Sequence, residues 1–166
     1  MADRASEILE CIPRLRRFAY TLTGDVADAD DLVQVCLERA LAKVNRRYKD
    51  GDMQSWLFKI MQNAFIDDCR SKQRKPGFVH IDEDEVSGVK DLSPDPETQL
   101  AHKEVMASVK ALPEDQRMIV GYILVDGRTY RETADLLGIP IGTVMSRLAR
   151  ARRSLAADLS FDMGGA

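Results

Sequence analysis

The stretch 127–153 carries the side chains best suited to contacting double-stranded DNA. Guanidinium groups pair with phosphates and hydrogen-bond guanine in the major groove, and hydroxyl and apolar groups contact other base edges. Six arginines lie in this stretch against only Glu132 and Asp135. The side chains expected to face bases are Thr143, Met145, Ser146, Arg147, Ala149 and Arg150, and those expected to reach phosphates are Arg152 and Arg153.

Two helices and a tight turn are needed to hold those side chains. Thr129 and Glu132 have the spacing of a capping box, which starts a helix. The small Ala134 lets two helices approach, and Gly138 permits the positive φ of a tight turn. Val144 then faces inward from the second helix. This is helix-turn-helix spacing, in which the second helix enters the major groove. The plainer alternative is a helical hairpin with a solvated basic face.

A second polar group lies on a helix expected from Met53 onward. Asn63, Asp67 and Arg70 stand at spacings of four and three residues, so they share one stripe of the helix surface. Arg74 extends the basic end of this helix. Amide and guanidinium groups in this arrangement are suited to hydrogen-bonding bases that have left the duplex stack.

Aromatic side chains near that helix are suited to stacking on such bases. Tyr48 lies in the polar loop before it, whereas Trp56 and Phe65 fall in its apolar phase. Core packing is therefore the expected role of Trp56 and Phe65.

An acidic and polar stripe lies opposite the apolar face of the preceding helix. It consists of Asp31, Gln34 and Glu38, three and four residues apart. A basic helical partner would complement its charge. From the residues alone, a solvated face is the favoured explanation.

Apolar residues at three- and four-residue spacing predict helices along most of the chain. Three are expected before residue 78 and four after residue 95, with no strands. Pro13 is expected in the first turn of the first helix, where its missing N–H costs little. A polar loop is expected over residues 45–52. The positions assigned to apolar faces include Leu41, Leu100 and Val105.

Charge divides the 166 residues unevenly. The net charge of −3 excludes a uniformly basic nucleic-acid coat but not a local basic face. The excess of negative charge falls in 79–98, which carries seven acidic residues and one basic residue and also holds several Pro, Ser and Gly residues. The expected organisation is an all-α fold of two small helical domains, 1–75 and 96–160, joined by a flexible acidic linker over 76–95. A short tail follows at 161–166.

Several site classes are not expected. The cysteines Cys11, Cys36 and Cys69 are far apart and lack a Cys-x-x-Cys pair, so neither a disulfide scaffold nor a zinc site is indicated. His80 and His102 do not stand at ligand spacing from them. No phosphate loop, Ser/His/Asp pattern or cofactor motif occurs, so no enzyme is expected. No apolar run is long enough to span a bilayer, which favours a cytoplasmic protein.

Four motifs taken together resemble one protein family. In order they are DADDLVQ, WLFKIMQNAFIDDCR, LPEDQRMIV and YRETADLLGIPIGTVMSRLARAR, and they cover roughly residues 10–157. Each is modest alone, but their order and separation are specific. The chain resembles the extracytoplasmic-function (ECF, group IV) sigma factors of bacterial RNA polymerase.

The resemblance implies roles for particular residues. The first domain would bind the clamp coiled coil of the polymerase β′ subunit and melt the minus-ten promoter element. Asn63 would help to capture a flipped base, beside a specificity loop at 48–54. The residues it assigns to polymerase binding are Asp30, Asp31, Gln34 and Glu38. Those assigned to minus-ten DNA are Tyr48, Asn63, Asp67, Arg70 and Arg74.

The second domain, by the same resemblance, would read the minus-thirty-five element and contact the polymerase β flap. An anti-sigma protein would control the factor by blocking both polymerase-binding faces. Two positions depart from the family's pattern. Val35 stands where an acidic residue is frequent, and Met145 where Lys or Arg is frequent, which predicts a changed base preference at one minus-thirty-five position.

Two other classes of protein remain as alternatives. A stand-alone helix-turn-helix regulator would use 127–153 but gives no role to 28–75. An enzyme acting on DNA, such as a recombinase or nuclease, would need a catalytic set that the sequence does not supply. Run-off transcription with core polymerase separates these alternatives.

Overall fold

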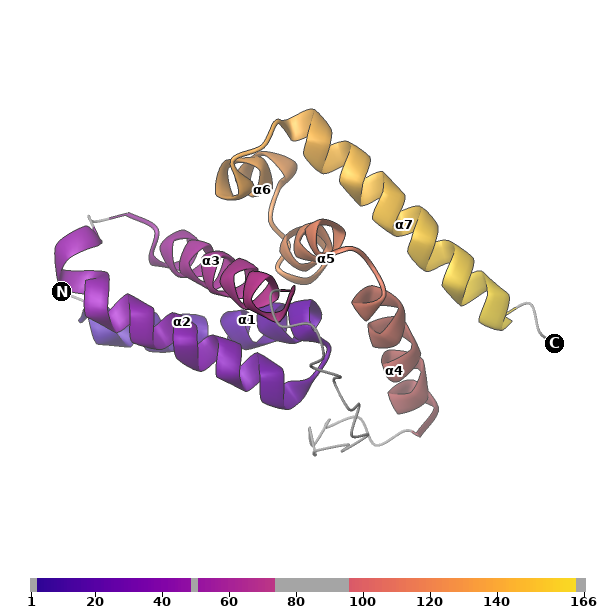
Figure 1. Ribbon diagram of the computed structural model, residues 1–166, viewed down its shortest axis with the longest axis horizontal. Coiled ribbons are helices and arrows are strands. Elements are labelled where there is room, and N and C mark those ends of the chain that lie inside the picture. Colours follow the sequence, from indigo (N-terminus) through magenta and orange to yellow (C-terminus); the bar gives the residue numbers. More distant parts are fainter. Residues whose placement is uncertain (1–2, 49–50, 74–95, 164–166) are drawn as a thin grey trace.

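The chain is all-α in the part described by a computed structural model, residues 3–48, 51–73 and 96–163 (Figure 1). The expected linker 76–95 and Arg74 lie outside these residues. The elements are α1 (Arg4–Thr23), α2 (Val26–Arg47), α3 (Met53–Gln73), α4 (Pro96–Lys110), α5 (Glu114–Val120), the π-helical turn η1 (Gly121–Val125), α6 (Tyr130–Leu137) and α7 (Ile141–Met163).

The expectation for Pro13 is wrong, because Pro13 lies inside α1 rather than in its first turn. Asp3 caps the helix by accepting a hydrogen bond from the backbone N–H of Ala5. Ile8 and Cys11 are buried ahead of the proline. Their packing against the core offsets the hydrogen bond that the proline removes.

Helix α2 begins after Asp25, whose carboxylate accepts a 2.7 Å hydrogen bond from Ala27 N–H. It extends to Arg47, so the predicted loop starts later than residue 45. Asp52 caps α3 through the N–H of Gln54, 3.1 Å away. Side-chain oxygens thus satisfy the free N–H groups at the start of both helices.

Several expected core positions are exposed. Leu41 on α2 keeps 59% of its accessible surface, and Leu100 on α4 keeps the same fraction. Val105 is exposed as well, and Val109 is the buried residue of α4. The helical period was predicted correctly, but in the described residues no neighbouring element covers these positions.

The helix-turn-helix forms as predicted. Thr129 Oγ1 accepts a hydrogen bond from Glu132 N–H at 3.1 Å, which is the capping-box contact. Gly138 closes α6 with φ of +66°. Ala134 and Val144 meet in a buried cluster with Ile119 and Leu148. α7 continues to Met163, into the segment expected as a tail.

One hydrophobic core links the two halves of the chain. It contains most of the buried residues of α1, α2 and α3 together with Met118, Tyr122 and Leu136 from the second half. In Figure 1, α5 lies between the α1–α3 bundle and α7. The two halves therefore pack together in a closed arrangement in this structure, which the sequence left undecided.

Candidate nucleic-acid interface

Helix α7 presents its polar side chains outward on a firmly packed base. Val144, Leu148 and Ala151 are buried on the opposite side. The predicted side chains that are exposed are Met145, Ser146, Ala149, Arg150, Arg152 and Arg153. Thr143 and Arg147 are half-buried. The structure thus brings the whole predicted set to one helix, with the arginines repeating along it.

Arg147 differs from the other arginines of α7 because it already has a partner. Its Nε lies 3.4 Å from a carboxylate oxygen of Asp115 at the start of α5. Both side chains are partly solvated, so the pair is a weak one. Arg147 must leave or share this partner to contact DNA, whereas Arg150 needs no such exchange among the described contacts.

The stripe on α3 also forms as predicted. Asn63, Asp67 and Arg70 are all exposed on this helix. Asp67 pairs with Arg39 of α2, with N and O atoms 3.0 Å apart. Asn63 is therefore the neutral donor and acceptor of the stripe, and Asp67 is partly neutralised.

Tyr48 is held by the protein rather than presented for stacking. Its hydroxyl donates to the carbonyl of Gly51 at 2.5 Å, and its ring centroid lies 5.5 Å from that of Trp56. The Arg4 guanidinium lies 5.6 Å from the same ring. These contacts fix the position of Tyr48 against Gly51, Trp56 and Arg4.

The acidic stripe of α2 is exposed, and its members interact locally. Gln34 donates to Glu38 at 3.3 Å, and Asp31 is exposed. Asp30 pairs with Arg16 of α1 at 3.1 Å. The stripe is thus a continuous polar surface rather than part of the core.

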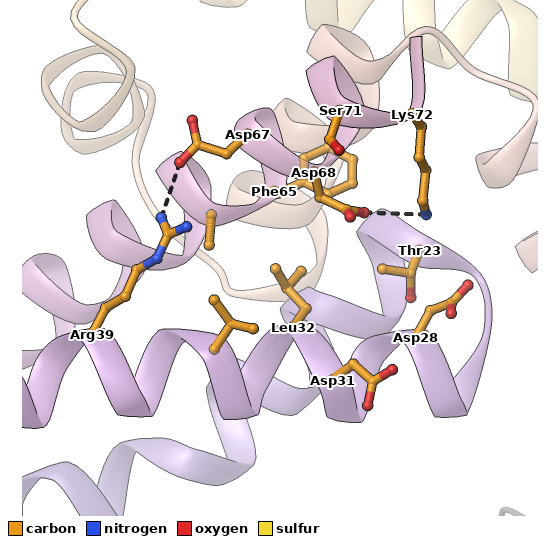
Figure 2. A pocket seen from close by; sticks show the side chains of 12 residues that line it. Thr23, Asp28, Asp31, Leu32, Arg39, Phe65, Asp67, Asp68, Ser71 and Lys72 are labelled. Carbon is orange, nitrogen blue, oxygen red and sulfur yellow. Dashed lines mark hydrogen bonds and ion pairs between the residues drawn. The ribbon is translucent and has the colours of Figure 1, made fainter. Parts of the chain in front are cut away.

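A groove between α2 and α3 adjoins the acidic stripe, and the sequence analysis did not find it (Figure 2). Its apolar lining comes from Leu32, Val35, Ala64 and Phe65. Carboxylates crowd its rim, balanced by the Arg39–Asp67 and Lys72–Asp68 pairs. The lining residues are Thr23, Asp28, Asp31, Leu32, Val35, Arg39, Ala64, Phe65, Asp67, Asp68, Ser71 and Lys72. Each helix alone shows only one wall, so the groove appears only when the two are packed.

The cysteines are placed for packing. Burial raises the pKa of the Cys36 thiol to about 12, and the thiol donates to the carbonyl of Leu57 at 3.4 Å. Burial and the nearby Glu114 raise the pKa of Cys69 to about 12. Burial also raises the pKa of Cys11. Protonated thiols are poor nucleophiles and poor metal ligands.

Within the described ranges no cluster of His, Cys, Asp and Glu could hold a metal ion, and no helix there is apolar and long enough to cross a bilayer.

Comparison with known proteins agrees with both halves of this geometry. Residues 8–62 match the model of the Sigma2 domain of PhyR, and residues 102–155 match sigma-70 region 4. The chain is 36% identical to the ECF RNA polymerase sigma factor EcfG of Rhodopseudomonas palustris, over 94% of this chain and 84% of that protein. It is 33% identical to the ECF RNA polymerase sigma factor SigE of Mycolicibacterium smegmatis, over 86% of this chain and 56% of that protein.

A solved structure has the same architecture along almost its whole length. It is the sigma factor RpoE of Bartonella quintana in complex with the anti-sigma factor NepR. The TM-score is 0.79 at 30% identity, covering 98% of this chain and 99% of that one. With a helix-turn-helix, matches to both sigma domains and a relative of this identity and coverage, the chain belongs to the ECF RNA polymerase sigma factors.

Proposed function

We propose that this sigma factor binds core RNA polymerase and directs promoter-specific initiation in the cytoplasm. One observation carries the proposal: this chain has three separate exposed polar faces. They are the arginines of α7, the α3 stripe and the acidic stripe of α2. A stand-alone helix-turn-helix regulator would have no use for the α3 stripe or the acidic stripe of α2. The chain itself is proposed to have no catalytic role.

The polymerase contact is assigned to α2. Asp31, Gln34 and Glu38 offer exposed carboxylate and amide groups, and Asp30 lies beside them. The α2–α3 groove continues this surface with an apolar floor and an acidic rim. A helical, basic segment such as the polymerase clamp coiled coil would complement both its shape and its charge.

The promoter contacts are assigned to two domains, 1–75 and 96–160. Asn63 and Arg70 would hydrogen-bond an unstacked minus-ten base and nearby phosphates, with Tyr48 supporting the loop. Arg74 would extend that surface. The N-terminal half of α7 would enter the major groove at the minus-thirty-five element. The second domain would also contact the β flap.

Control by an anti-sigma protein is supported by the relative from Bartonella quintana, whose structure contains one. In this chain the exposed stripe and groove of α2 and α3 are the surfaces that such a protein would have to cover. Competition between an anti-sigma protein and core polymerase for Asp31 and Glu38 would follow.

Run-off transcription with purified core polymerase and candidate promoters tests the proposal. A transcript that depends on this chain is expected, together with a stable complex with core polymerase. Absence of both the transcript and the complex would overturn it.

Replacing Arg150 with alanine is expected to reduce discrimination at one minus-thirty-five base pair by about 1–3 kcal/mol. The reason is that Arg150 is exposed on the side of α7 proposed to face DNA and, unlike Arg147, forms no ion pair within the described residues. Competition binding of holoenzyme to single-base promoter variants measures the effect. Arg152→Ala is the comparator, because a phosphate contact should weaken binding to all the variants equally. Identical base preferences for R150A and the unmodified protein would contradict the assignment.

A further inference from the structure

A buried charge network joins the two halves of the chain. Asp126 and Arg128, just after η1, keep 3% and 4% of their side-chain surface. Asp126 accepts from Arg14 of α1 at 2.8 and 2.9 Å, and from Arg128 at 2.8 Å. One carboxylate therefore pairs with two guanidinium groups, one from each half.

The same two arginines also reach the start of α3. Arg14 donates to the side-chain oxygen of Gln54, and Arg128 donates to Ser55 Oγ at 3.2 Å. Ser55 in turn donates to the carboxylate of Asp52. Asp52 and Gln54 flank Met53, the first residue of α3, so the charge network holds the start of this helix, next to the segment proposed to read the minus-ten element.

Close apolar packing surrounds this network. Tyr122 is fully buried, with its ring centroid 4.4 Å from that of Phe18, and its hydroxyl lies 2.9 Å from Gln62 Oε1. A side chain at Gly121 would meet Phe18, since a Cβ there would lie 2.7 Å from its ring. Gln62 also donates to the carbonyl of Leu136 in α6 at 3.2 Å. Polar and apolar contacts thus specify the same closed arrangement.

The closed arrangement cannot read a whole promoter. Elements centred near minus ten and minus thirty-five are about 25 base pairs apart, which is roughly 85 Å at 3.4 Å per base pair. α7 has 23 residues, and at 1.5 Å per residue it is about 35 Å long. Because α6 packs on both α7 and α3 here, the two reading surfaces lie far closer together than the two elements.

We propose that Arg14, Asp126 and Arg128 form a latch that keeps the free sigma factor closed and holds the start of α3 in place. The proposal rests on the proposed function. In the fully open form all three charged groups are in water. In a half-open form a charged group can stay buried after its partner has left, which costs more free energy. The latch therefore disfavours half-open forms more than the fully open one. Nη2 of Arg128 is buried without a hydrogen-bond partner in the described structure, which leaves the closed state incompletely satisfied.

The test replaces Asp126 with asparagine in the full chain and measures solution scattering without polymerase. Loss of the carboxylate leaves two guanidinium groups uncompensated, and the open-to-closed ratio is expected to rise by about a hundredfold. The radius of gyration should therefore increase. Asp135→Asn, on an exposed face of α6, is the matched control and should leave scattering unchanged. An unchanged radius of gyration for D126N would overturn the latch.

A second variant and a second measurement separate the latch from local misfolding. Arg14→Met removes the partner from the other half and should give the same expansion, with no further increase in the double variant. Both variants should keep the helical circular dichroism of the unmodified protein. If D126N expands the molecule but R14M does not, Asp126 acts only within its own half and the latch is wrong.

Affinity for core polymerase completes the test. If binding requires the open form, the apparent dissociation constant should fall in both variants as the open fraction rises, by about tenfold if about one molecule in ten of the unmodified protein is open. Expansion with unchanged affinity would overturn the inhibitory role. Failure of every form of the protein, unmodified included, to bind core polymerase would overturn the proposed function and leave the scattering result intact.

Discussion

Phe58→Ala is expected to lower the free energy of unfolding by about 3–5 kcal/mol, the cost typical of deleting a buried aromatic ring. Phe58 is fully buried on α3, and its ring centroid lies 5.1 Å from that of Phe18 and 5.9 Å from that of Tyr122. The guanidinium of Arg128 lies 4.8 Å from the same ring. The substitution therefore removes contacts within the first bundle and across the boundary between the halves.

Chemical denaturation followed by circular dichroism measures this loss. Leu9→Ala is the matched control, because Leu9 keeps 63% of its surface on α1 and its truncation should change stability by less than about 0.5 kcal/mol. A Phe58→Ala protein as stable as L9A would contradict the packing described. If the substitution instead separates the two halves while the α1–α3 bundle stays folded, the denaturation curve should show a second transition.

Asn63→Ala is expected to reduce open-complex formation roughly tenfold or more while leaving affinity for core polymerase within about twofold. The alanine cannot hydrogen-bond an unstacked base, and each such bond that is lost costs about 1–3 kcal/mol when its partner is left unsatisfied. Asn63 is exposed on α3 and lies on a different helix from the acidic stripe of α2. The two steps should therefore separate.

Permanganate footprinting of promoter melting and equilibrium binding of fluorescent protein to core polymerase make the two measurements. Asn45→Ala is the control, since Asn45 is also an exposed asparagine but lies near the end of α2. It should leave both quantities unchanged. Equal losses in melting and in core binding for N63A would reject the assigned role of Asn63.

The features that could be predicted from the sequence are those specified by neighbouring residues. The capping box at Thr129 and Glu132 and the turn at Gly138 need only local geometry, and both formed as expected. The stripe formed by Asn63 and Arg70 on one helix follows from the helical period alone.

The features that could not be predicted depend on which helices meet. Leu41 and Leu100 have the correct apolar phase, but no described element packs over them. Tyr122 is fully buried, but its partners Phe18 and Phe58 lie far away in the sequence, so no local pattern identifies them. Gly121 has an ordinary helical φ of −59°, so nothing local shows that Phe18 occupies the space of its missing side chain.

The shared core also makes closure depend on temperature. Opening exposes the rings of Phe18 and Tyr122 and the side chains of Met118 and Leu136 to water, which raises the heat capacity. The apolar part of the closing free energy weakens on cooling. Below the temperature at which the closed arrangement is most stable, a colder sample will therefore hold a larger fraction of open molecules, ready for polymerase without any change in partner concentration.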